Sequence, residues 1–417
     1  ESGKEGLWRD VQVTNLDLGA LTGNDLLGKT TGYLSIGKGS KGLNLDEIDV
    51  RFNGEFEEID LNNYVYTGIN IRQGRFGNEV FDGVIDVTDD NLALHYDGSV
   101  DLKGNMKFKF DVLIDSAVIS KLTNKHDSIV EKLISKVHVE IAGTSPENLE
   151  GSVFVEDLSY KENDIDFELD SLRLLIVKDL VSDSITVLSE MIDLRLTGKY
   201  DLLDLWPVVQ NQLSRVASNM IDPVNIGKTK NEFFDLEIDL KEVNPILQFF
   251  DENIFIAQDS RVRSTYNSTD LKLKVELNSD LVTYQEMKFT DIQFVTYFDS
   301  LRANVQYQIS KIELNDSLGV TNAAVFSYVK NNKFSTHIGW DGLGNIEPAL
   351  FAFSTVLEED HDVVTDFKPS FFFLKSHKWD VKPDSKLLWN KDVFELTDFE
   401  IKNGDHLIDV HGRVSHD

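Results

Sequence analysis

Apolar and charged residues alternate without interruption in Leu271-Lys272-Leu273-Lys274-Val275-Glu276-Leu277. Successive side chains of a β-strand point to opposite faces of a sheet, so this stretch predicts a strand with one apolar and one charged face. Similar alternation occurs at residues 108–114, 192–196 and 236–240, and in many shorter runs along the chain. The sequence therefore predicts a mainly-β protein.

Turn-forming residues separate these predicted strands. Asn53-Gly54, Asp97-Gly98, Lys103-Gly104-Asn105 and Asn403-Gly404 favour the tight reversals that join antiparallel neighbours. Strands and helices do not alternate along the chain, which argues against a doubly wound parallel sheet. We expect an elongated, antiparallel-rich sheet that folds over onto itself.

Helical spacing of apolar residues predicts two or three amphipathic helices, at 116–137, 202–220 and 243–250. These helices suggest three segments within one continuous unit. A β segment at 1–150 ends in the first helix, a second at 151–252 contains the other two, and a third covers 253–417.

Composition disfavours several classes of protein. The formal charge of −31, spread along the chain, repels nucleic-acid phosphates, so no nucleic-acid partner is expected. The absence of cysteine removes disulfides, thiolate metal sites and cysteine nucleophiles. No apolar run is long enough to span a bilayer, and the first residues do not resemble a signal peptide. We therefore expect any anchor or export signal to lie outside this sequence.

Two glycine-rich stretches resemble nucleotide-binding motifs. Gly23-Asn24-Asp25-Leu26-Leu27-Gly28-Lys29-Thr30 matches the phosphate-loop pattern, and Gly37-Lys38-Gly39-Ser40-Lys41-Gly42 matches the dinucleotide pattern. Each real motif leads into a helix N-terminus, whereas strand-like sequence follows both stretches here. We therefore interpret them as turns between strands.

No catalytic or metal-binding constellation is predicted. Asp82, Asp86, Asp89 and Asp90 lie close in sequence but do not follow a calcium-loop pattern. His406, His411 and His416 are spaced so that neighbours point to opposite faces of a strand. We expect no enzyme activity, no metal and no cofactor.

Several blocks resemble TamB proteins of the AsmA-like superfamily, of the Bacteroidetes type. They are Asp17-Leu18-Gly19, Leu27-Gly28-Lys29, Ile36-Gly37-Lys38-Gly39 and 81–92 near the start, then 149–153, 193–200, 379–381 and 408–414. The resemblance spans most of the chain and marks it as an internal segment of such a protein.

The resemblance implies a β-taco, a sheet curled into a trough with an apolar groove. It implies a non-catalytic, periplasmic bridge, anchored to the inner membrane in the full-length protein, that shields phospholipid acyl chains between the two membranes. It also implies outer-membrane protein assembly with a barrel protein of the BamA or TamA type, engaged through regions outside this sequence.

The groove is expected to be lined by the apolar members of alternating strands. These are Ile48, Val50, Phe52, Phe81, Ile85, Val87, Phe108, Phe110, Val112, Ile165, Phe167 and Leu169. Without the resemblance, the same alternation favours a dry β-sandwich core, as in a periplasmic or extracellular binding or adhesion module. Both interpretations remain open from the sequence.

Overall fold

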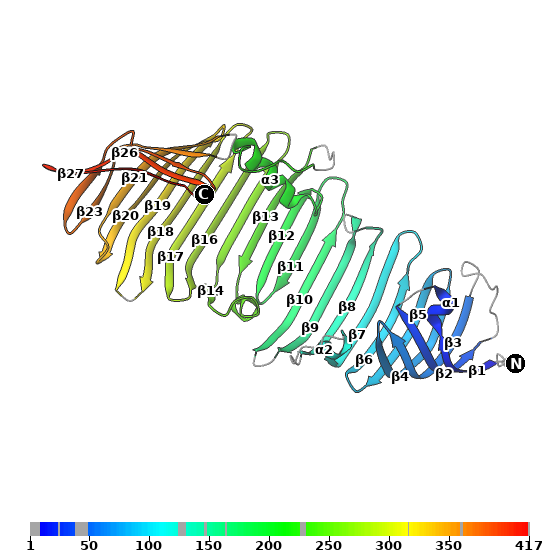
Figure 1. Cartoon of the computed structure of the whole chain (residues 1–417). Coiled ribbons are helices and arrows are strands. Elements are labelled where there is room, and N and C mark those ends of the chain that lie inside the picture. Colours follow the sequence, from blue (N-terminus) through cyan, green and yellow to red (C-terminus); the bar gives the residue numbers. More distant parts are fainter. Residues whose placement is uncertain are drawn as a thin grey trace. The chain divides into compact units, whose positions relative to one another are not determined.

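The computed structural model describes residues 9–23, 26–37, 49–123, 131–145, 148–162, 165–225, 231–315, 317–358 and 362–415. These residues form 27 strands, assigned to one sheet, and four helices. The pairings between these described strands are antiparallel, for example that of β16 (Lys272–Tyr284) with β17 (Met287–Phe298). The predicted mainly-β, antiparallel fold is confirmed (Figure 1).

The chain divides into two compact units. Unit 1 comprises Glu1–Lys178 and Ile185–Glu190, and unit 2 comprises Asp179–Ser184 and Met191–Asp417.

Unit 1 is an antiparallel meander in which each strand from β1 to β10 pairs with the next. Its elements are β1 (Arg9–Asp17), α1 (Leu18–Thr22), β2 (Leu27–Ile36), β3 (Asp49–Leu61), β4 (Tyr64–Gly77), β5 (Val80–Asp89), β6 (Leu92–Asp101), β7 (Met106–Val118), α2 (Ile119–Leu122), β8 (Glu131–Gly143), β9 (Glu150–Glu162) and β10 (Ile165–Val177), and most of β11 (Asp183–Ser189) follows.

Unit 2 continues in the same way from β12 to β21, with the short β14 pairing with β16 beside β15. Beyond β21 the ladder splits: β22 and β23 both pair with β21, β25 and β24 follow them, and β26 closes the split.

The elements of unit 2 are β12 (Ile192–Lys199), α3 (Leu205–Val216), β13 (Phe233–Leu240), α4 (Asn244–Leu247), β14 (Ile254–Ile256), β15 (Ser260–Asn267), β16 (Lys272–Tyr284), β17 (Met287–Phe298), β18 (Ala303–Asn315), β19 (Leu318–Lys330), β20 (Lys333–Gly344), β21 (Ala349–Leu357), β22 (Val363–Phe367), β23 (Ser370–Leu374), β24 (His377–Val381), β25 (Lys386–Trp389), β26 (Val393–Asn403) and β27 (His406–Ser415).

Residues with left-handed backbone conformations interrupt the strands of both units. Gln73 and Asp157 in unit 1 have φ of 52° and 51°, and Asp291 and Asn322 in unit 2 have φ of 51° and 52°. The pairing register shifts beside Asn322, where the β19 and β20 partners jump from Thr321 to Ala324. Such bulges bend a strand and increase its twist, so they help to curve each sheet.

The helix predicted at 116–137 is wrong. Residues up to Val118 belong to β7, Ile119–Leu122 form the single turn of α2, and β8 begins at Glu131; residues 124–130 lie outside the described part. Two apolar residues of this stretch also fit a period of two, because Leu133 and Val137 share one face of β8. The other two predictions are confirmed as the 12-residue α3 and the one-turn α4.

Candidate functional site

One face of the unit 1 sheet carries a row of apolar side chains that crosses its strands. Because cross-strand partners lie directly opposite one another, their side chains share a face. The pairings align a set that we call the unit 1 apolar row: Leu34, Ile71, Ile85, Tyr96, Val112, Val137, Val155 and Leu172, with Gly54 between Leu34 and Ile71. We call this face the inner face.

Unit 2 has an equivalent row on its own inner face. The pairings align the unit 2 apolar row: Leu194, Ile238, Val262, Leu277, Phe294, Tyr307, Val325, Ile338 and Phe351. Aromatic contacts reinforce it, with ring centroids 6.3 Å apart for Phe294 and Tyr307 and 5.9 Å apart for Trp340 and Phe351. An uncharged strip of hydrocarbon and aromatic surface therefore crosses nine strands.

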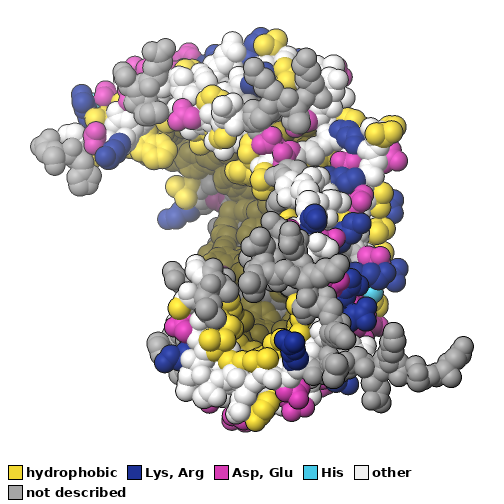
Figure 2. All heavy atoms as spheres, turned by 90° about the vertical axis from the view of Figure 1, so that its right-hand side faces the viewer, with side chains coloured by type: hydrophobic (Ala, Val, Ile, Leu, Met, Phe, Trp, Pro, Cys, Tyr) yellow, Lys and Arg dark blue, Asp and Glu magenta, His cyan; other side chains and the backbone are white. Residues whose placement is uncertain are grey.

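The members of both rows are half-buried, which distinguishes them from a closed core. The described residues contain 22 buried hydrophobic residues for 27 strands, fewer than one for each strand. A dry sandwich would bury the apolar face of nearly every strand at crystal-like density. Figure 2, viewed from the side that faces right in Figure 1, shows a hollow whose wall consists mostly of hydrophobic side chains.

Tyrosines on the inner face are neutral at ordinary pH. Burial raises the pKa of Tyr96, and the nearby carboxylates of Asp82 and Asp97 raise it further. Burial also raises the pKa of Tyr307. Hydroxyl groups beside the unit 2 row bond within the protein: Thr296 Oγ1 donates to the carbonyl oxygen of Asn304 at 3.2 Å. The rows thus offer apolar contact without charge.

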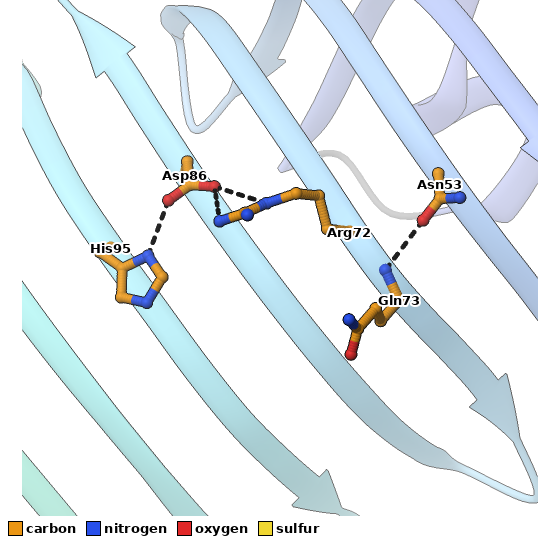
Figure 3. A network of polar contacts seen from close by, with 5 residues as sticks. All are labelled: Asn53, Arg72, Gln73, Asp86 and His95. Carbon is orange, nitrogen blue, oxygen red and sulfur yellow. Dashed lines mark hydrogen bonds and ion pairs between the residues drawn. The ribbon is translucent and has the colours of Figure 1, made fainter.

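The opposite, outer face is polar. In unit 1, Asp86 lies between Arg72 and His95, with Arg72 Nη2 at 2.5 Å and His95 Nδ1 at 2.7 Å from its carboxylate oxygens (Figure 3). The hydrogen bond from His95 and the Arg72 guanidinium outweigh burial and lower the pKa of Asp86. In unit 2, Arg263 pairs with Glu237 at 2.7 Å. These charges keep the outer face hydrated.

Eleven of the twelve groove residues predicted from sequence lie on the inner face of unit 1, and Ile48 lies outside the described residues. Ile85 and Val112 belong to the unit 1 apolar row, while Phe81 and Phe108 belong to a neighbouring row through Val100. The half-buried members are Val50, Phe52, Phe81, Ile85, Phe108, Phe110, Val112 and Ile165, and the buried ones are Val87, Phe167 and Leu169.

The sequence prediction missed the whole unit 2 row. Its signal was present in the alternation at 192–196, 236–240 and 271–277, and extending the groove along those strands would have identified Leu194, Ile238 and Leu277. Tyr96 and Tyr307 were missed because a tyrosine in an alternating strand does not show which way its strand faces.

The apparent nucleotide and metal motifs lie in ordinary sheet structure where they are described. Gly28, Lys29 and Thr30 belong to β2, so no helix N-terminus follows them. Asp89 accepts hydrogen bonds from Tyr64, Thr67 and Asn91. Among the described residues, no cluster of three or more His, Cys, Asp or Glu side chains is arranged to hold a metal ion. Residues 38–48 and His416 lie outside this part.

No protein-family model, curated protein or solved structure matches this chain. Within the described ranges, none of the helices has the length and hydropathy needed to cross a membrane. The case for a function therefore rests on the inner face itself.

Proposed function

We propose that the chain is a non-catalytic lipid-shielding segment whose inner faces cover acyl chains of phospholipids. The observation that supports this most directly is the pair of half-buried, uncharged apolar rows, each crossing a series of paired strands. Isolated apolar side chains are common on protein surfaces, whereas extended apolar strips mark sites for apolar ligands or partners.

The energetics favour a hydrocarbon ligand. Moving one methylene group out of water is favourable by about 0.8 kcal/mol. Burying the acyl chains of a phospholipid with roughly 30 methylenes is therefore favourable by about 20 kcal/mol. Neighbouring strands lie about 4.8 Å apart, so a row that crosses nine strands provides roughly 40 Å of apolar surface. An acyl chain lying along such a row would keep most of its methylenes out of water.

The cellular setting follows from the sequence resemblance alone. We propose a TamB-like bridge in the periplasm, held at the inner membrane through another part of the protein and carrying phospholipid between the inner and outer membranes. Assistance to outer-membrane protein assembly, through a BamA-type barrel protein, belongs to the same proposal.

A second candidate is a periplasmic or extracellular binding or adhesion module. The single sheet to which the described strands are assigned favours the first candidate, because a sandwich needs two facing sheets. The candidates differ in ligand, since the module would bind a protein or glycan on its surface and the shield would retain lipid.

Native mass spectrometry with lipid extraction tests the proposal on the purified chain. Val112→Asp and Leu277→Asp place one carboxylate in each apolar row. Leu113→Asp is a matched control, because Leu113 lies on the outer face of the same strand, opposite His95 and Lys136. We expect co-purified phospholipid in the wild type and the control.

The double variant Val112→Asp/Leu277→Asp should lose most of this lipid, since an unpaired carboxylate against hydrocarbon costs several kcal/mol. Absence of lipid from the wild type, or equal lipid in all three proteins, would refute the shielding role and favour the binding module.

A further inference from the structure

A second row of the unit 2 inner face is buried far more deeply than the unit 2 apolar row. Tyr266 pairs with Leu273, Leu273 with Phe298, and Phe298 with Ala303. We call these residues, with Phe234 and Val329, the covered row, and their exposed fractions are Phe234 5%, Tyr266 7%, Leu273 0%, Phe298 5%, Ala303 1% and Val329 4%. The covered row lies four residues, roughly 13 Å, along each strand from the half-buried apolar row.

Helix α3 packs against this row. Figure 1 shows α3 across the ends of the neighbouring strands of unit 2. Val208, Gln212 and Val216 are at most 3% exposed on α3, and Gln212 hydrogen-bonds to Tyr266 of the covered row. At about 1.5 Å per residue, the 12 residues of α3 extend roughly 18 Å, enough to cross about four strands.

The far end of α3 is attached to the turn between β19 and β20. The backbone N–H of Asn332 donates to the carbonyl oxygen of Val216 at 2.8 Å. The Asn332 side chain accepts from the N–H of Asn219 at 2.9 Å and donates to Ser218 Oγ at 3.1 Å. Asn219 Nδ2 also donates to the carbonyl oxygen of Leu357 at 2.8 Å, so the segment after α3 is held by Asn332 and by the end of β21.

The interface beneath α3 is poorly suited to permanent packing. Gln212 is 1% exposed, and its carbonyl oxygen has no hydrogen-bond partner among the described residues. Leaving such a group buried and unpaired costs roughly 1–3 kcal/mol. A helix that only stabilised the sheet would gain by presenting leucine here, and a 12-residue helix is marginal without tertiary contacts. The packing therefore retains a defect that favours release.

We propose that α3 is a displaceable cover of the unit 2 inner face. The helix occupies the covered row when no acyl chain is bound and moves off this row when an acyl chain enters. This inference rests on the proposed lipid-shielding function. The released row provides the same uncharged surface as the unit 2 apolar row, so the bound chain replaces the contacts that α3 gives up.

Two variants shift the cover in opposite directions. Gln212→Leu with Tyr266→Phe removes the unpaired carbonyl of Gln212 together with the Tyr266 hydroxyl that bonds to the same side chain, and should hold α3 in place. Asn332→Gly removes the side-chain attachment while retaining the left-handed conformation of Asn332, φ 60°. Asn331→Gly is the control, because it changes the same turn, where Asn331 has φ 49°, and keeps the Asn332 amide.

The measurements use the intact chain and a dansyl-labelled undecanoic acid as the acyl probe. Spin labels at Trp206→Cys and Lys272→Cys report the distance from α3 to the sheet, and the cysteine-free sequence ensures that only these positions are labelled. We expect this distance to increase as the probe binds. Binding should weaken by about tenfold in the double variant and tighten by about three- to tenfold in Asn332→Gly.

The outcomes separate this inference from the proposed function. One outcome is that the probe binds, the distance between the spin labels does not change on binding, and the variants bind the probe with wild-type affinity. In that case α3 is a fixed part of the sheet and the cover is refuted, while shielding stands. If the probe binds none of the proteins, shielding and cover both fail.

Discussion

The inner faces of the two units carry the same kind of apolar row, but they differ in what lies over the neighbouring rows. In unit 2 the 12-residue α3 lies against a buried row of the sheet. The described helices of unit 1, α1 and α2, have five and four residues. The comparison shows that alternation sets which face is apolar, whereas the segments between strands set how much of it water can reach.

The largest difference should appear within β16, where a covered and an uncovered leucine occur on one strand. Leu273 is 0% exposed and Leu277 is half-buried. Leu273→Ala should lower the free energy of unfolding by about 3 kcal/mol, because it opens a cavity beneath α3. Leu277→Ala should lower it by about 1 kcal/mol. Urea unfolding measures both, and equal losses would mean that α3 does not create the difference.

Glycines opposite aromatic residues should be equally sensitive in the two units. A Cβ at Gly98 would lie 2.3 Å from the carbonyl oxygen of Lys109, and one at Gly198 would lie 2.1 Å from that of Phe233. Each glycine also has a positive φ, 153° and 145°. Gly98→Ala and Gly198→Ala should each cost about 2–3 kcal/mol in thermal or urea unfolding.

Gly104→Ala is the control for this pair. Gly104 has φ 61°, but a Cβ there meets no atom within 4 Å, so the loss should be about 1 kcal/mol. A loss at Gly98 no larger than at Gly104 would show that the backbones do not approach as closely as described.

Much of the sheet could be predicted from sequence, because apolar and polar residues that alternate with a period of two are typical of a strand with one apolar face. Leu273, Val275 and Leu277 alternate with charged residues, and the structure places them in a strand. The prediction failed at 116–137, where apolar residues from two strands and a short helix combined to imitate helical spacing. Local periodicity cannot show that the chain reverses within the window.

Other features depended on contacts that sequence does not encode locally. The spacing predicted a helix near α3, yet its end is bonded to Asn332, which follows the helix by 116 positions. The left-handed conformations of Asp291 and Asn322 within strands were not predicted, because Asp and Asn adopt them in turns as readily as within strands.

Substitutions at the bulges of β19 and β4 should have a smaller effect on the free energy of unfolding, and the effect should be similar in the two units. Asn322 has φ 52° and donates from Nδ2 to Asp341 Oδ2 at 2.8 Å, and Gln73 of unit 1 has the same φ. Asn322→Val and Gln73→Val should each cost about 1–2 kcal/mol, since a β-branched residue disfavours this conformation. Asn322→Gly should cost less in the same urea titration. A glycine that costs as much as valine would assign the effect to the Asp341 contact instead.

The smallest expected effect on stability concerns two carboxylates whose pKa values shift in opposite directions, Asp89 of unit 1 and Asp204 of unit 2. Burial raises the pKa of Asp89, but hydrogen bonds from Tyr64, Asn91 and Thr67 outweigh it, so the pKa of this carboxyl lies below the ordinary value of an aspartate. Burial and the neighbouring Asp201 raise the pKa of Asp204, which precedes α3 without a side-chain capping bond. The two carboxylates therefore contribute to stability with opposite signs.

A carboxylate with a lowered folded pKa stabilises above its unfolded pKa and loses this contribution as the pH falls through the folded value. One with a raised pKa favours folding at low pH, and this contribution is lost as the pH rises through its folded value. At pH 7, Asp89→Asn should therefore destabilise the protein and Asp204→Asn should stabilise it, each by under about 1 kcal/mol because both sites are partly hydrated. Urea titrations at pH 7 and pH 3 test this, since both differences in the free energy of unfolding between variant and wild type should shrink in acid. A difference for Asp204→Asn that persists at pH 3 would assign its effect to packing at the start of α3 instead of charge.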